Sequence, residues 1–152
     1  MKTFVDSFNR TWSVSVNVAT IKRVKSLMGL NLMEAVTGDL IESLKADPCL
    51  LVDVIYCVCK NEADAKGITD ESFGEAMAGD AIENATDAFL DELIEFFPSE
   101  KKMILKKAFQ KVKQAEKKAL QMGEKYLEGL QIENRIEEKL TSIFNGASSL
   151  QE

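Results

Sequence analysis

Hydrophobic and polar residues alternate near the start of the chain. The alternating apolar positions are Trp12, Val14, Val16 and Val18, and polar residues separate them. A period of two is typical of a half-buried β-strand. The apolar pair Phe4-Val5 and the polar residues that follow it predict a partner strand and a turn. Because an isolated two-stranded hairpin is marginal in water, we expect this hairpin to pack against helices.

The hydrophobic period then changes to that of a helix. Ile21, Val24 and Leu27 recur at helical spacing, and Gly29 follows as a plausible C-terminal cap. The pair Asp47-Pro48 predicts the start of another helix. The stretch after it, residues 49–59, is apolar almost all round, so we interpret it as the buried central helix. Its expected core positions are Leu51, Val54, Ile55 and Val58.

The segment from residue 62 to residue 98 predicts a loop and two helices. We interpret Glu62 to Thr69 as a polar loop, followed by a short helix that carries Phe73. Gly79-Asp80 opens a longer helix, which Pro98 ends. Apolar stripes on helices usually face the interior, so we expect one face of this helix to be core. That face contains Ile82, Ala85, Phe89, Leu93, Phe96 and Phe97.

A long lysine-rich helix is predicted to begin at Ser99. Its apolar positions follow a spacing of three and four residues, which is the pattern of a heptad seam. The seam consists of Leu105, Ala108, Val112, Ala115, Ala119, Met122 and Tyr126. Three lysines recur at one flanking position of successive heptads, and they are Lys111, Lys118 and Lys125. A further short amphipathic segment is indicated by Ile136, Leu140, Ile143 and Phe144.

Together these patterns predict a mainly α fold of the α+β class. We expect an N-terminal β-hairpin, a helical domain and a long lysine-rich C-terminal helix. The predicted boundaries are 1–98 for the hairpin-plus-helices core domain, 99–146 for the lysine-rich helical extension and 147–152 for a frayed tail.

Charge is distributed unevenly along the chain. Residues 1–98 hold 8 Lys/Arg and 17 Asp/Glu, whereas residues 99–152 hold 11 Lys/Arg and 8 Asp/Glu. The lysine-rich helix therefore has three interpretations: it pairs with the acidic stretch 80–95 of its own chain, it receives a helix from another chain, or it contacts nucleic acid. The last is disfavoured because the helix lacks arginine and the protein is acidic overall. We predict that the seam and its flanking lysines bind a helix of a second copy or a client protein.

Few residue types suited to catalysis or metal binding are present. The chain has no histidine, which removes the usual His-dependent nucleophile systems and imidazole metal ligands. Cys57 and Cys59 cannot chelate one ion together from one helix, so we interpret them as core residues. The loop at 62–67 resembles a calcium loop only superficially, because its twelfth position is Phe73. We expect neither enzyme activity nor a cofactor nor a metal.

Two further features bear on the compartment. No apolar run approaches the roughly 20 residues that span a membrane, and the first residues reach Asp6 too early for a secretory signal peptide. An odd number of cysteines also argues against a disulfide framework. We therefore expect a cytoplasmic protein without a membrane partner.

The order of elements resembles a known family. An R-x-W-x-V-x-V strand at 10–16 is followed by a helix that ends at Gly29-Leu30, a segment with Asp and Leu at 39–44, the apolar helix from Pro48, the run 68–73 (ITDESF) and an acidic helix. This arrangement is similar to the tail assembly chaperones of long-tailed phages and related small proteins of gene-transfer-agent tail clusters. The resemblance covers residues 4–98, and the extension at 99–146 has no counterpart in it.

The resemblance implies a non-enzymatic role in virion assembly. Such chaperones coat helical tape-measure proteins before the tail tube forms, so the implied partners are tape-measure-like helices, other tail proteins and further copies of the chain. The implied location is the cytoplasm of the host cell. The alternative is a small adaptor or regulatory protein whose basic helix contacts nucleic acid. A small enzyme with carboxylate chemistry is the third hypothesis.

Overall fold

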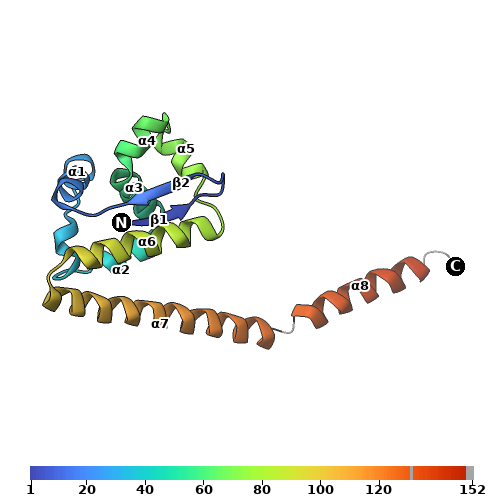
Figure 1. The fold of residues 1–152 in the computed structure, drawn as a ribbon. Helices are drawn as coiled ribbons and strands as arrows, with labels where there is room; N and C mark the ends of the chain where they lie inside the picture. Colours follow the sequence, from blue (N-terminus) through green and yellow to red (C-terminus); the bar gives the residue numbers. More distant parts are fainter. Residues whose placement is uncertain (131, 150–152) are drawn as a thin grey trace. The chain divides into compact units, whose positions relative to one another are not determined.

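The computed structural model describes residues 1–130 and 132–149, and it confirms a mainly helical fold with one N-terminal hairpin. The chain forms two compact units, Met1–Phe109 and Gln110–Glu152, which we call the first and the second unit. Figure 1 shows the elements in order. They are β1 (Lys2–Val5), β2 (Thr11–Val14), α1 (Val18–Met28), the 3-10 helix η1 (Leu32–Ala35), α2 (Leu40–Ala46), α3 (Pro48–Val58), α4 (Lys60–Lys66), α5 (Asp70–Glu75), α6 (Asp80–Phe96), α7 (Ser99–Gly129) and α8 (Ile132–Ser149).

The hairpin pairs β1 with β2 in antiparallel register, with Phe4 opposite Trp12. The period of two places both side chains on the buried face of the hairpin. The strand ends earlier than the alternation, however. Asn17 caps α1 by accepting a hydrogen bond from the Thr20 backbone N–H at 3.0 Å, so Val18 begins a helix and is 57% exposed. The hairpin is therefore confirmed, but its second strand is shorter than residues 12–18.

The core of the first unit is built around α3. The four predicted positions of α3, Leu51, Val54, Ile55 and Val58, are all buried. Trp12 is fully buried and its ring meets that of Phe73 edge-on, with 5.0 Å between the ring centroids. Helix α6 lies along β1 (Figure 1) and buries Phe89 and Leu93. The hairpin is thus held by helices, as its small size requires.

Residues 62–69, predicted as a loop, are largely helical. Helix α4 covers Lys60–Lys66, and Gly67 ends it with a positive φ of 66°. Two ion pairs at i,i+4 spacing, Lys60 with Asp64 and Lys66 with Glu62, support this short helix. Only Ala63 of α4 is buried, so the helix has almost no apolar stripe that the sequence pattern could detect.

Helix α4 also covers the outer edge of β2. The Ser13 backbone N–H donates to the Glu62 carboxylate at 2.9 Å, and the Lys66 ammonium donates to the Thr11 carbonyl at 2.7 Å. The Cys59 thiol, which precedes α4, lies 3.7 Å from the Ser13 carbonyl oxygen. Side chains therefore occupy backbone groups that a further strand would otherwise use.

The first unit extends beyond the expected boundary at residue 98. Leu105 and Phe109 of α7 are 1% and 8% exposed and belong to the core of this unit. At the other end of the chain, α8 continues to Ser149, so residues 147–149 of the expected frayed tail are helical. Residues 150–152 lie outside the described part. Among the described residues, no helix has the length and apolar character needed to cross a lipid bilayer.

Candidate protein-interaction surface

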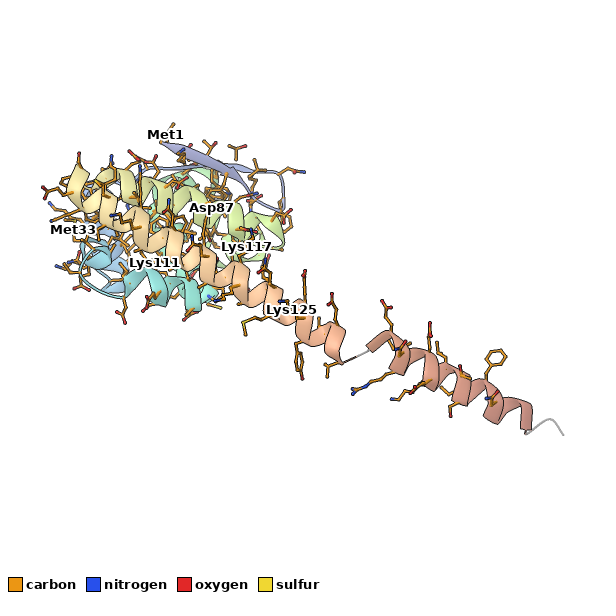
Figure 2. All side chains as sticks on the ribbon, turned by 90° about the horizontal axis from the view of Figure 1, so that it is seen from below. Met1, Met33, Asp87, Lys111, Lys117 and Lys125 are labelled. Carbon is orange, nitrogen blue, oxygen red and sulfur yellow. The ribbon has the colours of Figure 1, made fainter. Side chains whose placement is uncertain are left out.

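Most of the predicted binding residues lie on the part of α7 that belongs to the second unit. Val112 is half-buried and Ala115 and Ala119 are exposed, while Met122 and Tyr126 are 65% and 67% exposed. The predicted lysines Lys111, Lys118 and Lys125 are also exposed, and Figure 2 shows Lys111, Lys117 and Lys125 following one another along α7. The structure therefore places the seam from Val112 onward on one exposed helix.

The beginning of the predicted seam differs in burial from the rest. Leu105 packs into the core of the first unit, so it is not available to a partner. Its buried neighbour is Phe109, four residues later, and the predicted seam residue Ala108 is exposed. A spacing of four also places two residues on one helical face, and this signal could have identified Phe109 from the sequence.

An acidic residue of α6 holds the first turns of α7. The Lys102 ammonium lies 2.9 Å from the Glu95 carboxylate, and Lys106 lies 3.9 Å from it. The hydrogen bond from Lys102, together with its charge, lowers the pKa of Glu95. Of the three interpretations of the lysine-rich helix, pairing with the acidic stretch of the same chain is therefore observed for these turns.

The exposed apolar surface of α7 is wider than the predicted seam. Leu120 and Leu127 are 73% and 53% exposed, and each follows a seam residue by one position. At 100° per residue, the positions from Met122 to Leu120 cover roughly 160° of the helix, which is wider than a two-position coiled-coil seam. We call this surface the apolar arc. It consists of Val112, Ala115, Ala119, Leu120, Met122, Tyr126 and Leu127.

Helix α8 carries a second exposed stripe, which lies on the amphipathic segment that the sequence pattern indicated. Its four large apolar residues are exposed by 54%, 59%, 68% and 78%. In chain order they are Ile136, Leu140, Ile143 and Phe144. An isolated amphipathic helix gains most of its stability when another apolar surface covers its stripe. Helices α7 and α8 thus both present the type of surface that binds a helix.

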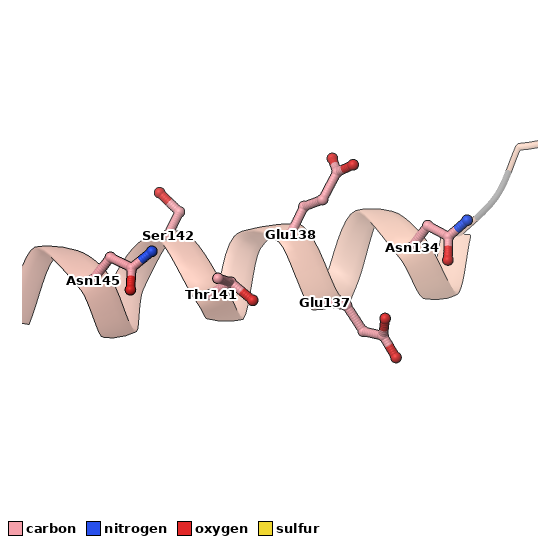
Figure 3. Close-up of a pocket in the computed structure, with 6 residues that line it drawn as sticks. All are labelled: Asn134, Glu137, Glu138, Thr141, Ser142 and Asn145. Carbon is pink, nitrogen blue, oxygen red and sulfur yellow. The ribbon is translucent and has the colours of Figure 1, made fainter.

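The polar face of α8 forms a shallow hollow (Figure 3). All six lining side chains come from this one helix, and Glu138 and Ser142 point to one side while Glu137 points to the other. A small-molecule site normally surrounds its ligand with several elements. This hollow is therefore the solvent-facing side of an amphipathic helix. The lining residues are Asn134, Glu137, Glu138, Thr141, Ser142 and Asn145.

The best-connected carboxylate of the first unit, Asp6, has a structural role. It is buried and accepts hydrogen bonds from the backbone N–H groups of Phe8 and Arg10, from the Arg10 side chain at 2.7 Å and from the Trp12 indole N–H at 2.8 Å. Burial opposes ionisation, but these hydrogen bonds prevail and lower the pKa of Asp6. The network locks the hairpin turn to the core.

The two cysteines that were predicted to be core residues are buried. Cys57 and Cys59 are buried, whereas Cys49 is exposed. Burial, with a further contribution from Glu62, raises the pKa of Cys59 to about 12, so its thiol stays protonated and weakly reactive. No group of three or more Cys, Asp or Glu side chains within residues 1–130 and 132–149 is arranged to hold a metal ion.

Comparisons of the chain with protein-family models, with curated proteins and with solved structures found no match.

Proposed function

We propose that the chain is a non-enzymatic assembly chaperone of the phage-tail type. It binds helical segments of a tape-measure-type client in the cytoplasm and acts together with further copies of itself. The observation that carries this proposal is the exposure of apolar side chains on α7 and α8. In the described part of the second unit, eight large apolar side chains of these helices are between 53% and 78% exposed. They are Leu120, Met122, Tyr126, Leu127, Ile136, Leu140, Ile143 and Phe144.

The distribution of these residues supports binding of helices. Contiguous apolar surface on an otherwise charged protein is typical of a protein-interaction site. A helix binds such a surface by laying its own apolar stripe against it. The alanines at 115 and 119 would let a client helix approach α7 closely, because their side chains are small. The packed first unit would serve as the charged carrier of this surface.

The test is co-expression of the full chain with a helix-rich tape-measure-type protein. We expect the chain to keep the client in solution and to co-purify with it. Ala115→Arg places a bulky charge in the apolar arc and should abolish co-purification. Gln121→Arg adds the same charge on the opposite side of α7 and should leave co-purification intact.

Two results would argue against the proposal. Equal client recovery with both variants would show that the apolar arc is not the binding surface. Binding of duplex DNA that weakens steeply with added salt, without client binding, would favour the nucleic-acid adaptor instead.

A further inference from the structure

Lysines border the apolar arc of α7 on both sides. Beside the arc, one border carries Lys113 and Lys117 and then Glu124, and the other carries Lys111, Lys118 and Lys125, while Glu116 lies within the arc. Along each border the residues are four or seven positions apart, a spacing that keeps them on one side of a helix. The opposite face carries glutamines at 110, 114 and 121. A helix that covers the apolar arc would therefore lie between two borders whose charges are mainly positive.

The first turns of α7 also combine apolar residues with neighbouring lysines, and there the structure shows which groups the lysines contact. There the buried Leu105 and Phe109 are accompanied by Lys102 and Lys106, and both lysines pair with Glu95 of α6. Helix α6, which carries Glu95, is strongly acidic, since Asp80–Phe96 contains six Asp/Glu and no Lys/Arg. In the first unit, the start of α7 thus combines two buried apolar side chains with ion pairs to an acidic helix.

We infer that the partner of the apolar arc is also an acidic amphipathic helix, with Asp or Glu on both borders of its apolar stripe. The inference rests on the proposed function and specifies the chemistry of the client segment. Apolar burial supplies most of the affinity, because exposed ion pairs contribute only about 0.2–1 kcal/mol each. The charges supply selectivity, since a basic helix would meet two borders of mainly like charge.

A second copy of α7 fits this surface less well. In an antiparallel pair, the border with Lys111, Lys118 and Lys125 would face the same border of the partner. In a parallel coiled coil, each residue at the heptad position of Lys111, Lys118 and Lys125 faces a residue of the partner helix whose number is higher by five. Lys111 would then meet a carboxylate at Glu116, but Lys118 and Lys125 would meet Gly123 and Leu130. Carboxylates must therefore come from a different helix.

The experiment measures binding of three synthetic helical peptides to the full-length chain. The peptides span three heptads with leucine at both seam positions, and they differ only at the flanking positions, which are all Glu, all Gln or all Lys. We expect the Glu peptide to bind best and the Lys peptide about tenfold or more weakly, because several weak pairs act together. The difference should shrink as salt shortens the range of the charges.

A charge-reversed variant tests the location of the site. Lys111→Glu with Lys118→Glu should reverse the preference toward the Lys peptide. The matched control is Lys22→Glu with Lys25→Glu, which makes the same change in net charge at exposed positions of α1. This control should leave the order of the peptides unchanged.

The outcomes separate this inference from the proposed function. Equal binding of all three peptides, or an equal effect of both double variants, would overturn the acidic-helix inference and leave client binding intact. Binding of no peptide, together with loss of client co-purification, would overturn the proposed function itself. Sedimentation that shows a dimer disrupted by Ala115→Arg and unable to take up the Glu peptide would assign the apolar arc to a second copy.

Discussion

Two phenylalanines, each on an amphipathic helix, illustrate how the two units differ. Phe109 closes the core of the first unit and is 8% exposed, whereas Phe144 on α8 is 78% exposed. Both follow the same helical rule, in which apolar residues recur three or four positions apart. The comparison teaches that this pattern identifies the apolar face of a helix but does not identify what covers the face.

The largest expected effect is a difference in stability between these two positions. Phe109→Ala should lower the free energy of unfolding by about 3–5 kcal/mol, because it removes buried surface and leaves a cavity. Phe144→Ala should change it by less than about 0.5 kcal/mol, as expected for an exposed position. Urea unfolding of both variants measures the difference. Similar losses at the two positions would show that α8 is covered within a single chain.

The buried carboxylate of the first unit gives the next largest effect. Asp6→Asn should cost about 3 kcal/mol near neutral pH, because Arg10 and Trp12 lose a charged acceptor. The pKa of Asp6 in the folded protein is below its ordinary value of 3.8. Ionised Asp6 therefore stabilises the fold above that pH, and the contribution is lost as the pH falls through the lowered pKa.

Urea unfolding of the wild type and of Asp6→Asn at several acidic pH values tests the direction of this pH dependence of stability. The stability gap between the two proteins should narrow progressively below pH 3.8. A gap that stays constant would mean that the carboxylate charge does not stabilise the hairpin.

A smaller effect is expected where α4 meets the hairpin. Glu62→Ala removes the acceptor of the Ser13 backbone N–H and the ion-pair partner of Lys66. Glu62 is partly exposed, so water can replace the lost acceptor, and the cost should be about 1 kcal/mol. Thermal unfolding measures this loss. Glu71→Ala, at an exposed position of α5, is the matched control and should have a smaller effect.

The smallest effect concerns reactivity and leaves stability unchanged. A thiol reagent should modify one cysteine of the native protein, the exposed Cys49, and all three after denaturation. Cys57 and Cys59 are protected by burial, which also raises the pKa of both thiols. Mass spectrometry counts the modified sites. Rapid native modification of Cys59 would show that the first unit opens more readily than its packing implies.

Much of the fold could be predicted from the spacing of apolar residues, because an element that buries one face must place apolar residues at the period of that element. The hairpin faces and the core of α3 follow directly from apolar spacing. Helix α4 could not be recognised in this way, since its stability comes from ion pairs, from Gly67 and from a single buried alanine. The end of β2 was misplaced because the cap at Asn17 starts α1 while the apolar alternation continues.

The candidate surface was predicted in outline and differs in detail. A strict three-four count included Leu105, which the core of the first unit covers, and omitted Leu120 and Leu127, which lie beside the seam. A three-four spacing identifies only one narrow stripe along the helix, whereas the exposed apolar surface of α7 is wider than that stripe. The proposed partner remains a prediction, because the structure shows only that most side chains of the apolar arc are exposed in this chain.

The covered edge of β2 has a consequence for the behaviour of many copies crowded together. Open strand edges can template one another and grow into fibrils when chains accumulate at high local concentration. Here Glu62, Lys66 and Cys59 occupy backbone groups of Thr11 and Ser13 that such growth would use at β2. Under the proposed function, copies gathered along one long client would therefore be crowded together without this edge seeding an amyloid-like stack.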